Sequence, residues 1–117
     1  MEMRGKSLQS ELKYHTEIIE GGNIMKITVI TGSPRRHGNS FAMTEAFIKE
    51  AEHCGHEVKR FDAAFMKVGG CHACMTCYKT GKACSFNEEF DLIASSILDS
   101  DAILFTMPVY WYSIPAQ

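Results

Sequence analysis

Four cysteines gather in one short stretch of the chain. They are Cys71, Cys74, Cys77 and Cys84, in the pattern C-x2-C-x2-C-x6-C, and the sequence holds only one further cysteine. Three closely spaced thiolates and a fourth further along can bind three corners of an iron–sulfur cubane and close the fourth. The spacing therefore makes a [4Fe–4S] cluster one candidate for this stretch.

Two other interpretations of the cysteine stretch stay open. Structural zinc also accepts four thiolates, although its ligands usually form two C-x2-C pairs separated by a longer segment. The stretch can equally be a loop that binds no metal. A disulfide framework is disfavoured, because we expect a reducing, cytoplasmic environment. We interpret His72, inside the loop, as solvated, and Cys54 as a small core residue of a helix.

A second candidate site is the segment GSPRRHGNS, residues 32–40. Glycine lets backbone approach an anion, and the free N–H groups of a helix start carry partial positive charge. The candidate ligands in this segment are Ser33, Arg35 or Arg36, Gly38, Asn39 and Ser40. The spacing matches neither the nucleoside-triphosphate loop nor the G-x-G-x-x-G turn. The segment therefore predicts a site for a single terminal phosphate; the alternative is a turn that binds nothing.

Alternating strands and helices must position both segments. We expect strands at residues 24–31, 56–62 and 101–106, and helices at about 40–54 and 87–98. The apolar positions expected to face the core are Met43, Phe47, Ala51 and Cys54 on the first helix and Phe90, Ile93, Ala94, Ile97 and Leu98 on the second. Right-handed crossovers then predict a parallel sheet in the order 2-1-3, with ligands outside the carboxyl ends of the two inner strands.

Three motifs occur in order between about Met25 and the last residue. They are TGSPRRHGNS, then GCHACMTC and GKAC followed by NEEF, and finally DAILFTMPVYWYSIPAQ. Together they resemble the NADPH-dependent FMN reductase and iron–sulfur flavoprotein family of the flavodoxin-like superfamily. The resemblance implies FMN with its phosphate on Ser33, Arg35, Asn39 and Ser40 and its ring beside Pro108, Val109, Tyr110 and Trp111. The same aromatic run also suits core or subunit-interface packing.

The resemblance implies a redox function. We expect an FMN-dependent oxidoreductase or electron-transfer flavoprotein of the NADPH-dependent FMN reductase type, whose partners are NAD(P)H and an electron acceptor. FMN can take up two electrons as hydride and release them one at a time, whereas one cluster carries a single electron. FMN and a cluster together would therefore convert two-electron transfer into one-electron transfer. We predict no catalytic side chain. No visible motif distinguishes NADPH from NADH.

Length and charge bound the domain organisation. The 117 residues suffice for one modest domain, which we place at residues 25–117 as the N-terminal portion of a flavodoxin-like FMN-binding domain. Residues 1–24 form a polar extension, in which Leu8, Leu12, His15 and Ile19 have helical spacing. A net charge of −2 gives no basic surface for nucleic acid, and no apolar run approaches a membrane span of about 20 residues.

The doubly wound flavodoxin-like α/β sheet has five strands in the order 2-1-3-4-5. This sequence stops one loop after the third, so we expect a truncated sheet whose third strand is an apolar edge. Such an edge favours association, and we expect a homo-oligomer. The alternative to a redox flavoprotein is therefore an incomplete flavodoxin-like module that binds no flavin productively and associates with itself or with a partner.

Overall fold

The computed structural model describes residues 22–114, so most of the expected polar extension lies outside the described residues. A three-stranded parallel sheet forms the centre, in the order β2-β1-β3. Its strands are β1 (Lys26–Thr31), β2 (Glu57–Asp62) and β3 (Ala102–Thr106). The α/β class, the parallel direction and the strand order predicted from the sequence are confirmed.

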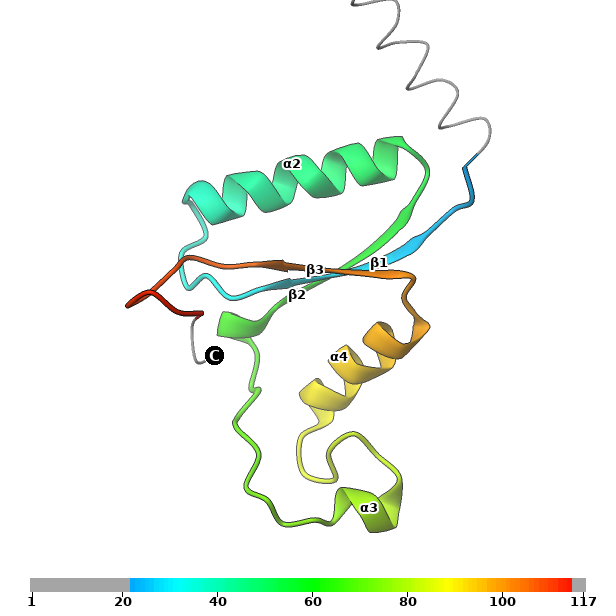
Figure 1. Ribbon diagram of the computed structural model, residues 1–117, viewed down its shortest axis with the longest axis vertical. Helices are drawn as coiled ribbons and strands as arrows, with labels where there is room; N and C mark the ends of the chain where they lie inside the picture. The colour runs from blue at the N-terminus through cyan, green and yellow to red at the C-terminus, as the bar shows by residue number, and fades with distance from the viewer. Residues whose placement is uncertain (1–21, 115–117) are drawn as a thin grey trace, which may run out of the picture.

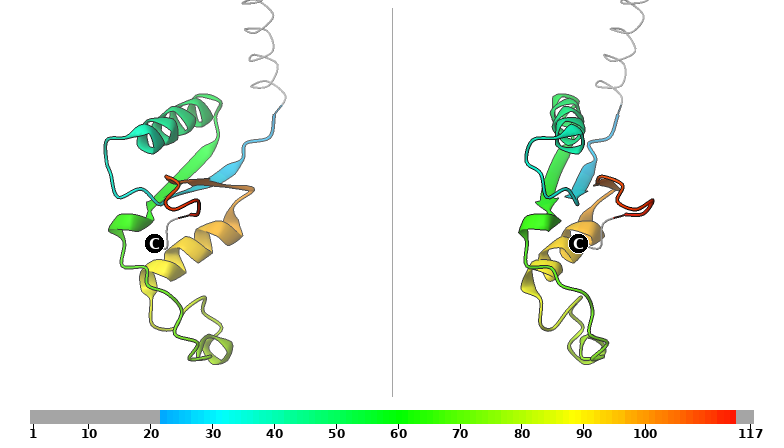
Figure 2. Two further views of the ribbon diagram at one scale, coloured as in Figure 1. Left: turned by 60° about the vertical axis from the view of Figure 1, so that its left-hand side comes forward. Right: turned by 90° about the vertical axis from the view of Figure 1, so that its left-hand side faces the viewer.

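Two helices cover opposite faces of the sheet, as Figures 1 and 2 show. They are α2 (Asn39–His53) and α4 (Glu88–Asp99). The segment between β2 and α4, expected as one continuous loop, instead contains a 3-10 turn at Ala63–Phe65 and a short helix α3 (Cys77–Thr80). In both figures α3 lies beyond the N-terminal end of α4, away from the sheet.

The core lies between the sheet and α2. Val29 is completely buried, and Ile27 and Ala51 are almost completely buried beside it. The predicted apolar stripe of α2 is partly wrong, because Met43 is 70% exposed and Phe47 is 38% exposed. Ala51 is buried as predicted, and Thr44 faces the sheet in place of the two large residues. Thr44 belongs there because its hydroxyl finds partners in the sheet and in the helix itself.

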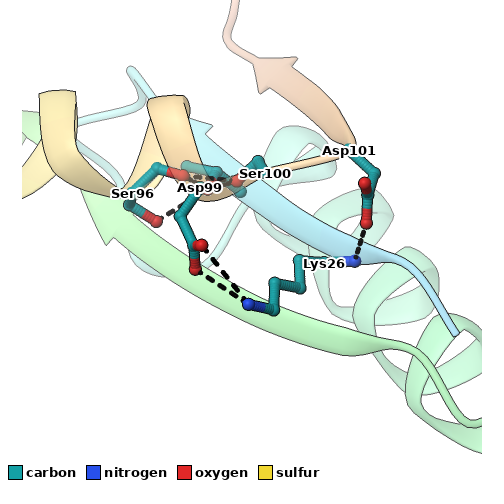
Figure 3. A network of polar contacts seen from close by, with 6 residues as sticks. Lys26, Ser96, Asp99, Ser100 and Asp101 are labelled. Carbon is teal, nitrogen blue, oxygen red and sulfur yellow. Dashed lines mark hydrogen bonds and ion pairs between the residues drawn. The ribbon is translucent and has the colours of Figure 1, made fainter.

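The other face of the sheet carries a polar contact with α4, seen in Figure 3. The Thr28 hydroxyl oxygen lies 2.7 Å from the Ser96 hydroxyl oxygen, and Ser100 donates to the Ser96 carbonyl at 2.6 Å. Ile93 is buried as predicted, whereas Leu98 is 88% exposed, so the expected α4 stripe is also partly wrong. Ser96 was not expected on the buried face of the helix because its side chain is polar. It faces the strand because the Thr28 hydroxyl is its hydrogen-bond partner there.

The amino end of the sheet is fastened by charged groups. Lys26 Nζ lies 3.2 Å from Asp99 Oδ2, and the Lys26 backbone N–H donates to Asp101 Oδ2 at 2.8 Å (Figure 3). The hydrogen bond and the charge of Asp99 raise the pKa of Lys26 above its ordinary value. These contacts connect β1 to the segment between α4 and β3.

Apolar side chains of β3 stand open on the α4 side. Ile103 is 44% exposed and Phe105 is 59% exposed. In the described part of the chain, β3 pairs with β1 along one side only. The expected edge position of the third strand is therefore what the structure shows. Over residues 22–114, no helix combines the length and the apolar character that crossing a membrane requires.

Candidate functional site

The segment that follows β1 lies where the strands end. The Gly32 backbone N–H donates to the carbonyl oxygen of Thr106, the last residue of β3, at 2.9 Å. In Figure 1 the loop before α2 and the segment after β3 both leave the same end of the sheet. The two segments expected at the ligand crevice are therefore neighbours, as the topology predicts.

The helix that follows this loop begins with an open N-terminus. Gly38 is its N-cap residue, no side chain caps the helix there, and its first turn holds no acidic residue. The first backbone hydrogen bond of the helix runs from Ala42 to the Gly38 carbonyl. The N–H groups before it carry the partial positive charge of a helix start, which suits an anion.

A small recess opens beside this helix start. Of the residues predicted from the sequence to hold a phosphate, Ser33, Arg35, Arg36 and Ser40 line it. Gly38 and Asn39 lie at the helix start but do not line the recess. The recess measures about 20 Å³, so it has room for one small group and none for a ring system.

Sequence reasoning missed the part of the recess that comes from other strands and from deeper in the helix. These additional polar residues are Thr31, Thr44, Arg60, Asp62 and Thr106. Arg60 and Asp62 stand at the carboxyl end of a strand whose charges suggested only an edge position. The predicted strand order could have placed these two residues near the site, because the carboxyl ends of neighbouring parallel strands meet at one edge of a sheet.

Asp62 is held by two donors inside the recess. Its Oδ1 accepts from the Thr31 hydroxyl at 2.6 Å and from Arg60 Nε at 3.0 Å. Partial burial alone would raise the pKa of Asp62, but the hydrogen bond from Thr31 and the contacts with Arg60 together lower it below its ordinary value. The carboxylate is therefore ionised at neutral pH.

Three arginines and one carboxylate line the recess, and Glu45, which does not line it, pairs with Arg60, so one net positive charge is left. The guanidinium of Arg36 lies 4.2 Å from the centre of the Phe65 ring, and that of Arg60 lies 4.9 Å from the centre of the Phe41 ring. Planar stacking of this kind restricts an arginine side chain. A phosphate monoester carries about −1.5 to −2 charges at neutral pH, so the recess matches it in the sign of the charge.

The segment after β3 carries the other predicted flavin contacts, Pro108, Val109, Tyr110 and Trp111. None of the four lines the recess. Tyr110 and Ser113 exchange backbone hydrogen bonds of 3.0 and 2.9 Å across a tight turn. Its two central residues, Trp111 and Tyr112, have φ values of 49° and 59°, and both rings are almost completely exposed. Left-handed backbone at two aromatic residues is strained, and such strain gathers at functional sites.

The four clustered cysteines line one hollow on the far side of the molecule. The hollow measures about 750 Å³ and has a mostly apolar wall that includes Tyr78, Phe86 and Phe90. Cys71 and Cys74 are exposed, Cys77 and Cys84 are half-buried, and all four are free thiols. The four predicted metal ligands therefore line the same hollow.

The first turn of α4 anchors both ends of the cysteine loop. Asp91 accepts a hydrogen bond from the Cys84 backbone N–H at 2.8 Å. Glu89 accepts another from the Lys67 backbone N–H. Between these anchors, Gly81 ends α3 with a φ of 72° and donates to the Cys77 carbonyl. The acidic residues at the start of α4 thus position the loop as well as stabilising the helix.

The donor set fits an iron–sulfur cluster in kind and in number, but not in its present spacing. Within residues 22–114, no three His, Cys, Asp or Glu side chains converge closely enough to hold a metal ion. Hydrogen bonds from the backbone and the side chain of Thr76 lower the pKa of the Cys74 thiol below its ordinary value. Ala73 and Met75, between the first three cysteines, have φ values of 55° and 61°. The loop is therefore tightly turned between its thiols.

Two smaller predictions concern residues near these sites. His72 is exposed, in agreement with the prediction that it is solvated. Cys54 is half-buried at the C-terminal cap of α2, with its Sγ 3.9 Å from Glu50 Oε1. Its assignment to the core was wrong, because the stripe that reaches the sheet runs through Thr44 and Ala51.

Comparison with known proteins adds to this geometry. The chain is similar to an iron-sulfur flavoprotein of Archaeoglobus fulgidus, with 36% identity over 93 residues that cover 80% of this chain and 42% of that relative. An iron-sulfur flavoprotein of Clostridioides difficile is 35% identical over 77% of this chain and 41% of its own length. One of Methanosarcina thermophila is 32% identical over 80% of this chain and 48% of its own length. No solved structure matches the chain at a significant level.

The chain spans less than half the length of these curated relatives. The family model described as NADPH-dependent FMN reductase matches residues 25–117. That match covers most of the chain and includes the recess, the cysteine loop and the turn after β3. The chain therefore belongs to the NADPH-dependent FMN reductase family.

Proposed function

We propose that this chain forms the phosphate-binding part of an FMN-dependent oxidoreductase or electron-transfer flavoprotein. The observation that carries the proposal is the recess at the carboxyl ends of β1 and β2, where arginines outnumber carboxylates beside an open helix start. Membership of the NADPH-dependent FMN reductase family supports FMN as the ligand. The recess suits a single phosphate in charge and in its supply of donors.

The residues of the recess have distinct tasks in this proposal. Ser33 and Ser40 donate hydroxyl hydrogen bonds to phosphate oxygens, and Arg35 supplies a guanidinium fork. Gly38 and Asn39 place the first helical N–H groups at the same phosphate. The ring system lies outside the small recess, toward Pro108, Val109, Tyr110 and Trp111. The strained turn that exposes Trp111 and Tyr112 supports this placement, because it presents aromatic surface at the same end of the sheet.

The cysteine loop is proposed to hold a [4Fe–4S] cluster through Cys71, Cys74, Cys77 and Cys84. Four free thiols around one mostly apolar hollow support this assignment. The names of the relatives also support it, since those three proteins are called iron-sulfur flavoproteins. Zinc remains the chemical competitor, because it also accepts four thiolates.

When bound, FMN supplies hydride and single-electron chemistry, and a cluster supplies one-electron transfer. The chain itself contributes binding and electrostatics. Its arginines neutralise the phosphate, and its loop hydroxyls fix the position of that group. The wall of the cysteine hollow is mostly apolar and half-buries Cys77 and Cys84, whereas Cys71 and Cys74 are exposed. We propose NAD(P)H and an electron acceptor as partners, and a homo-oligomer as the assembly, because the open side of β3 favours association.

Visible absorption of protein purified without air tests the flavin proposal. We expect a flavin spectrum after reconstitution with FMN, and release of the flavin on denaturation. Ser40→Ala should weaken FMN binding, whereas Ser95→Ala, at an exposed position on α4, is the matched control. Protein that stays colourless with FMN and associates with itself would instead support the incomplete module.

Iron and acid-labile sulfide analysis tests the cluster separately. Cys77→Ser should lower both, and Cys54→Ser is the control, because Cys54 lies on α2 outside the loop. Zinc in place of iron in protein made with both metals would assign the loop to zinc. Iron that is unchanged in the Cys77 variant removes that residue as a ligand.

A further inference from the structure

We propose that Arg60 is a further phosphate-binding residue, delivered to the recess from β2 and oriented by Asp62 and Glu45. The inference deepens the proposed function, because it assigns a specificity determinant to the same site. It concerns a residue outside the loop between β1 and α2. Its physical basis is the way in which the guanidinium is held.

The strand register places Arg60 beside the start of α2. In the parallel pairing, Val29 lies opposite Arg60 and Thr31 lies opposite Asp62. Side chains alternate along a strand, so Arg60 shares the face of Val58, which packs against the core beneath α2. Arg60 thereby reaches the first turns of that helix, where it contacts Phe41 and Glu45.

Three contacts fix the guanidinium of Arg60. Nε donates to Asp62 Oδ1 at 3.0 Å, a terminal nitrogen pairs with Glu45, and the plane lies over the Phe41 ring. The side chain is only 22% exposed. A guanidinium has five N–H donors, and these two carboxylate contacts need not use more than two of them. The remaining donors belong to a side chain that lines the recess.

A purely structural ion pair is the competing explanation. It would account for the contacts with Asp62 and Glu45, but it gives no reason for a mostly buried arginine to line a recess that also holds Arg35 and Arg36. Asp62 and Glu45 offset two of the three arginine charges, so one positive charge stays without a carboxylate partner at the recess. A phosphate supplies charge of the opposite sign, and a preformed guanidinium fork binds its oxygens without further ordering.

The test compares ligands that differ only in the phosphate. FMN and riboflavin binding are measured by flavin fluorescence for the full chain and for Arg60→Gln, Arg60→Lys and Lys59→Gln. Lys59 is the matched control, because it is the preceding residue of β2, is exposed and carries the same charge. We expect Arg60→Gln to weaken FMN binding about tenfold or more, as the loss of one charge-assisted hydrogen bond does, and to leave riboflavin binding unchanged.

Inorganic phosphate is the second probe. Its binding is measured by competition with FMN and by calorimetry. Arg60→Lys keeps the charge but loses the fork, so we expect an intermediate affinity for both phosphate ligands. Thermal unfolding identifies any variant that no longer folds. If Arg60→Gln does not fold, Arg60→Lys is compared with the unchanged chain in its place. Lys59→Gln should behave as the unchanged chain.

The outcomes separate this inference from the proposed function. FMN that binds equally well to the unchanged chain and to a folded Arg60→Gln variant overturns the role of Arg60 and leaves the flavin assignment in place. Inorganic phosphate that binds through Arg60, in a chain that does not bind FMN, supports Arg60 and overturns the flavin assignment. A chain that binds neither FMN nor phosphate overturns both.

Discussion

The backbone N–H of Gly32 donates to the carbonyl oxygen of Thr106 at 2.9 Å, and this bond continues the β1–β3 ladder one residue past the end of β1. It fixes the first residue of the loop before α2 against the last residue of β3. The Thr44 hydroxyl oxygen lies 2.7 Å from the Thr106 hydroxyl oxygen, so α2 is fastened to the same point. The recess is thus built where three elements are joined.

Thr44→Val should destabilise this junction. Thr44 is fully buried, and its hydroxyl also donates to the Ser40 carbonyl at 2.7 Å. Valine has the same shape without the hydroxyl, so buried partners lose a hydrogen bond, at a cost of about 1–3 kcal/mol. Chemical denaturation measures this change in the free energy of unfolding. Thr44→Ser keeps the hydroxyl and should lose less, and a serine variant that is less stable than the valine variant would contradict the explanation.

The Thr28 and Ser96 hydroxyls should be energetically coupled. Both residues are buried, and their oxygens lie 2.7 Å apart between β1 and α4. Thr28→Val removes the hydroxyl that both Ser96 and Ser100 contact and should cost about 1–3 kcal/mol. Ser96→Ala leaves the Thr28 hydroxyl its bond to the Ser96 carbonyl, so it should cost only about 0.5–1.5 kcal/mol. The double variant should cost less than the sum, with a coupling of about 0.5 kcal/mol or more. Additive costs in urea denaturation would show that the two hydroxyls act independently.

Strand order and strand ends followed from the sequence because they depend on long apolar runs and on the handedness of crossovers. The expected start of the second helix at residue 87 agrees with the structure, where Asn87 is the N-cap and accepts from the Phe90 backbone N–H at 2.9 Å. Which face of each helix is buried was harder to predict from the sequence. Periodicity favours the largest apolar residues, whereas Thr44 and Ser96 turn inward because each finds a specific partner there.

The candidate site also contains residues that the sequence predicted and residues that it did not. The predicted phosphate ligands Ser33, Arg35 and Ser40 are close in sequence, so one motif predicted them together, and all three line the recess. Arg60 and Asp62 reach the recess only through strand pairing, and Asp62 bonds to Thr31, which is 31 residues away. A local pattern contains no information of that kind. The short helix α3 was missed because its four residues lie within a stretch dominated by cysteine and glycine.

Asp62 should make stability depend on pH in acid. Its pKa in the folded state lies below the ordinary value of 3.8, so its contribution is complete above the pKa of the unfolded chain. That contribution is lost as the pH falls below about 3.8 and through the folded pKa. Asp62→Asn should therefore be less stable than the unchanged chain at pH 7, and the difference should shrink at lower pH. A difference that is constant from pH 7 to pH 3, measured by urea denaturation, would contradict this reasoning.

Asn87→Ala should weaken the start of α4. The Asn87 side chain accepts from the Phe90 backbone N–H, and alanine leaves that donor without its cap. The expected loss is about 1 kcal/mol in the free energy of unfolding. Asn87→Ser, which can also cap, should recover most of it. Equal destabilisation by alanine and serine would show that the asparagine acts through some other contact.

Asp91→Ala should impair iron retention without removing a thiol. Asp91 accepts from the Cys84 backbone N–H at 2.8 Å and so fixes the fourth proposed ligand against α4. Residues that orient a metal ligand typically affect metal affinity about 10- to 100-fold, so the variant should lose iron to a chelator at a correspondingly lower chelator concentration. Glu88→Ala is the matched control, because Glu88 is an exposed acidic residue of the same helical turn. If both variants released iron equally, the charge of the helix start rather than the bond to Cys84 would be responsible.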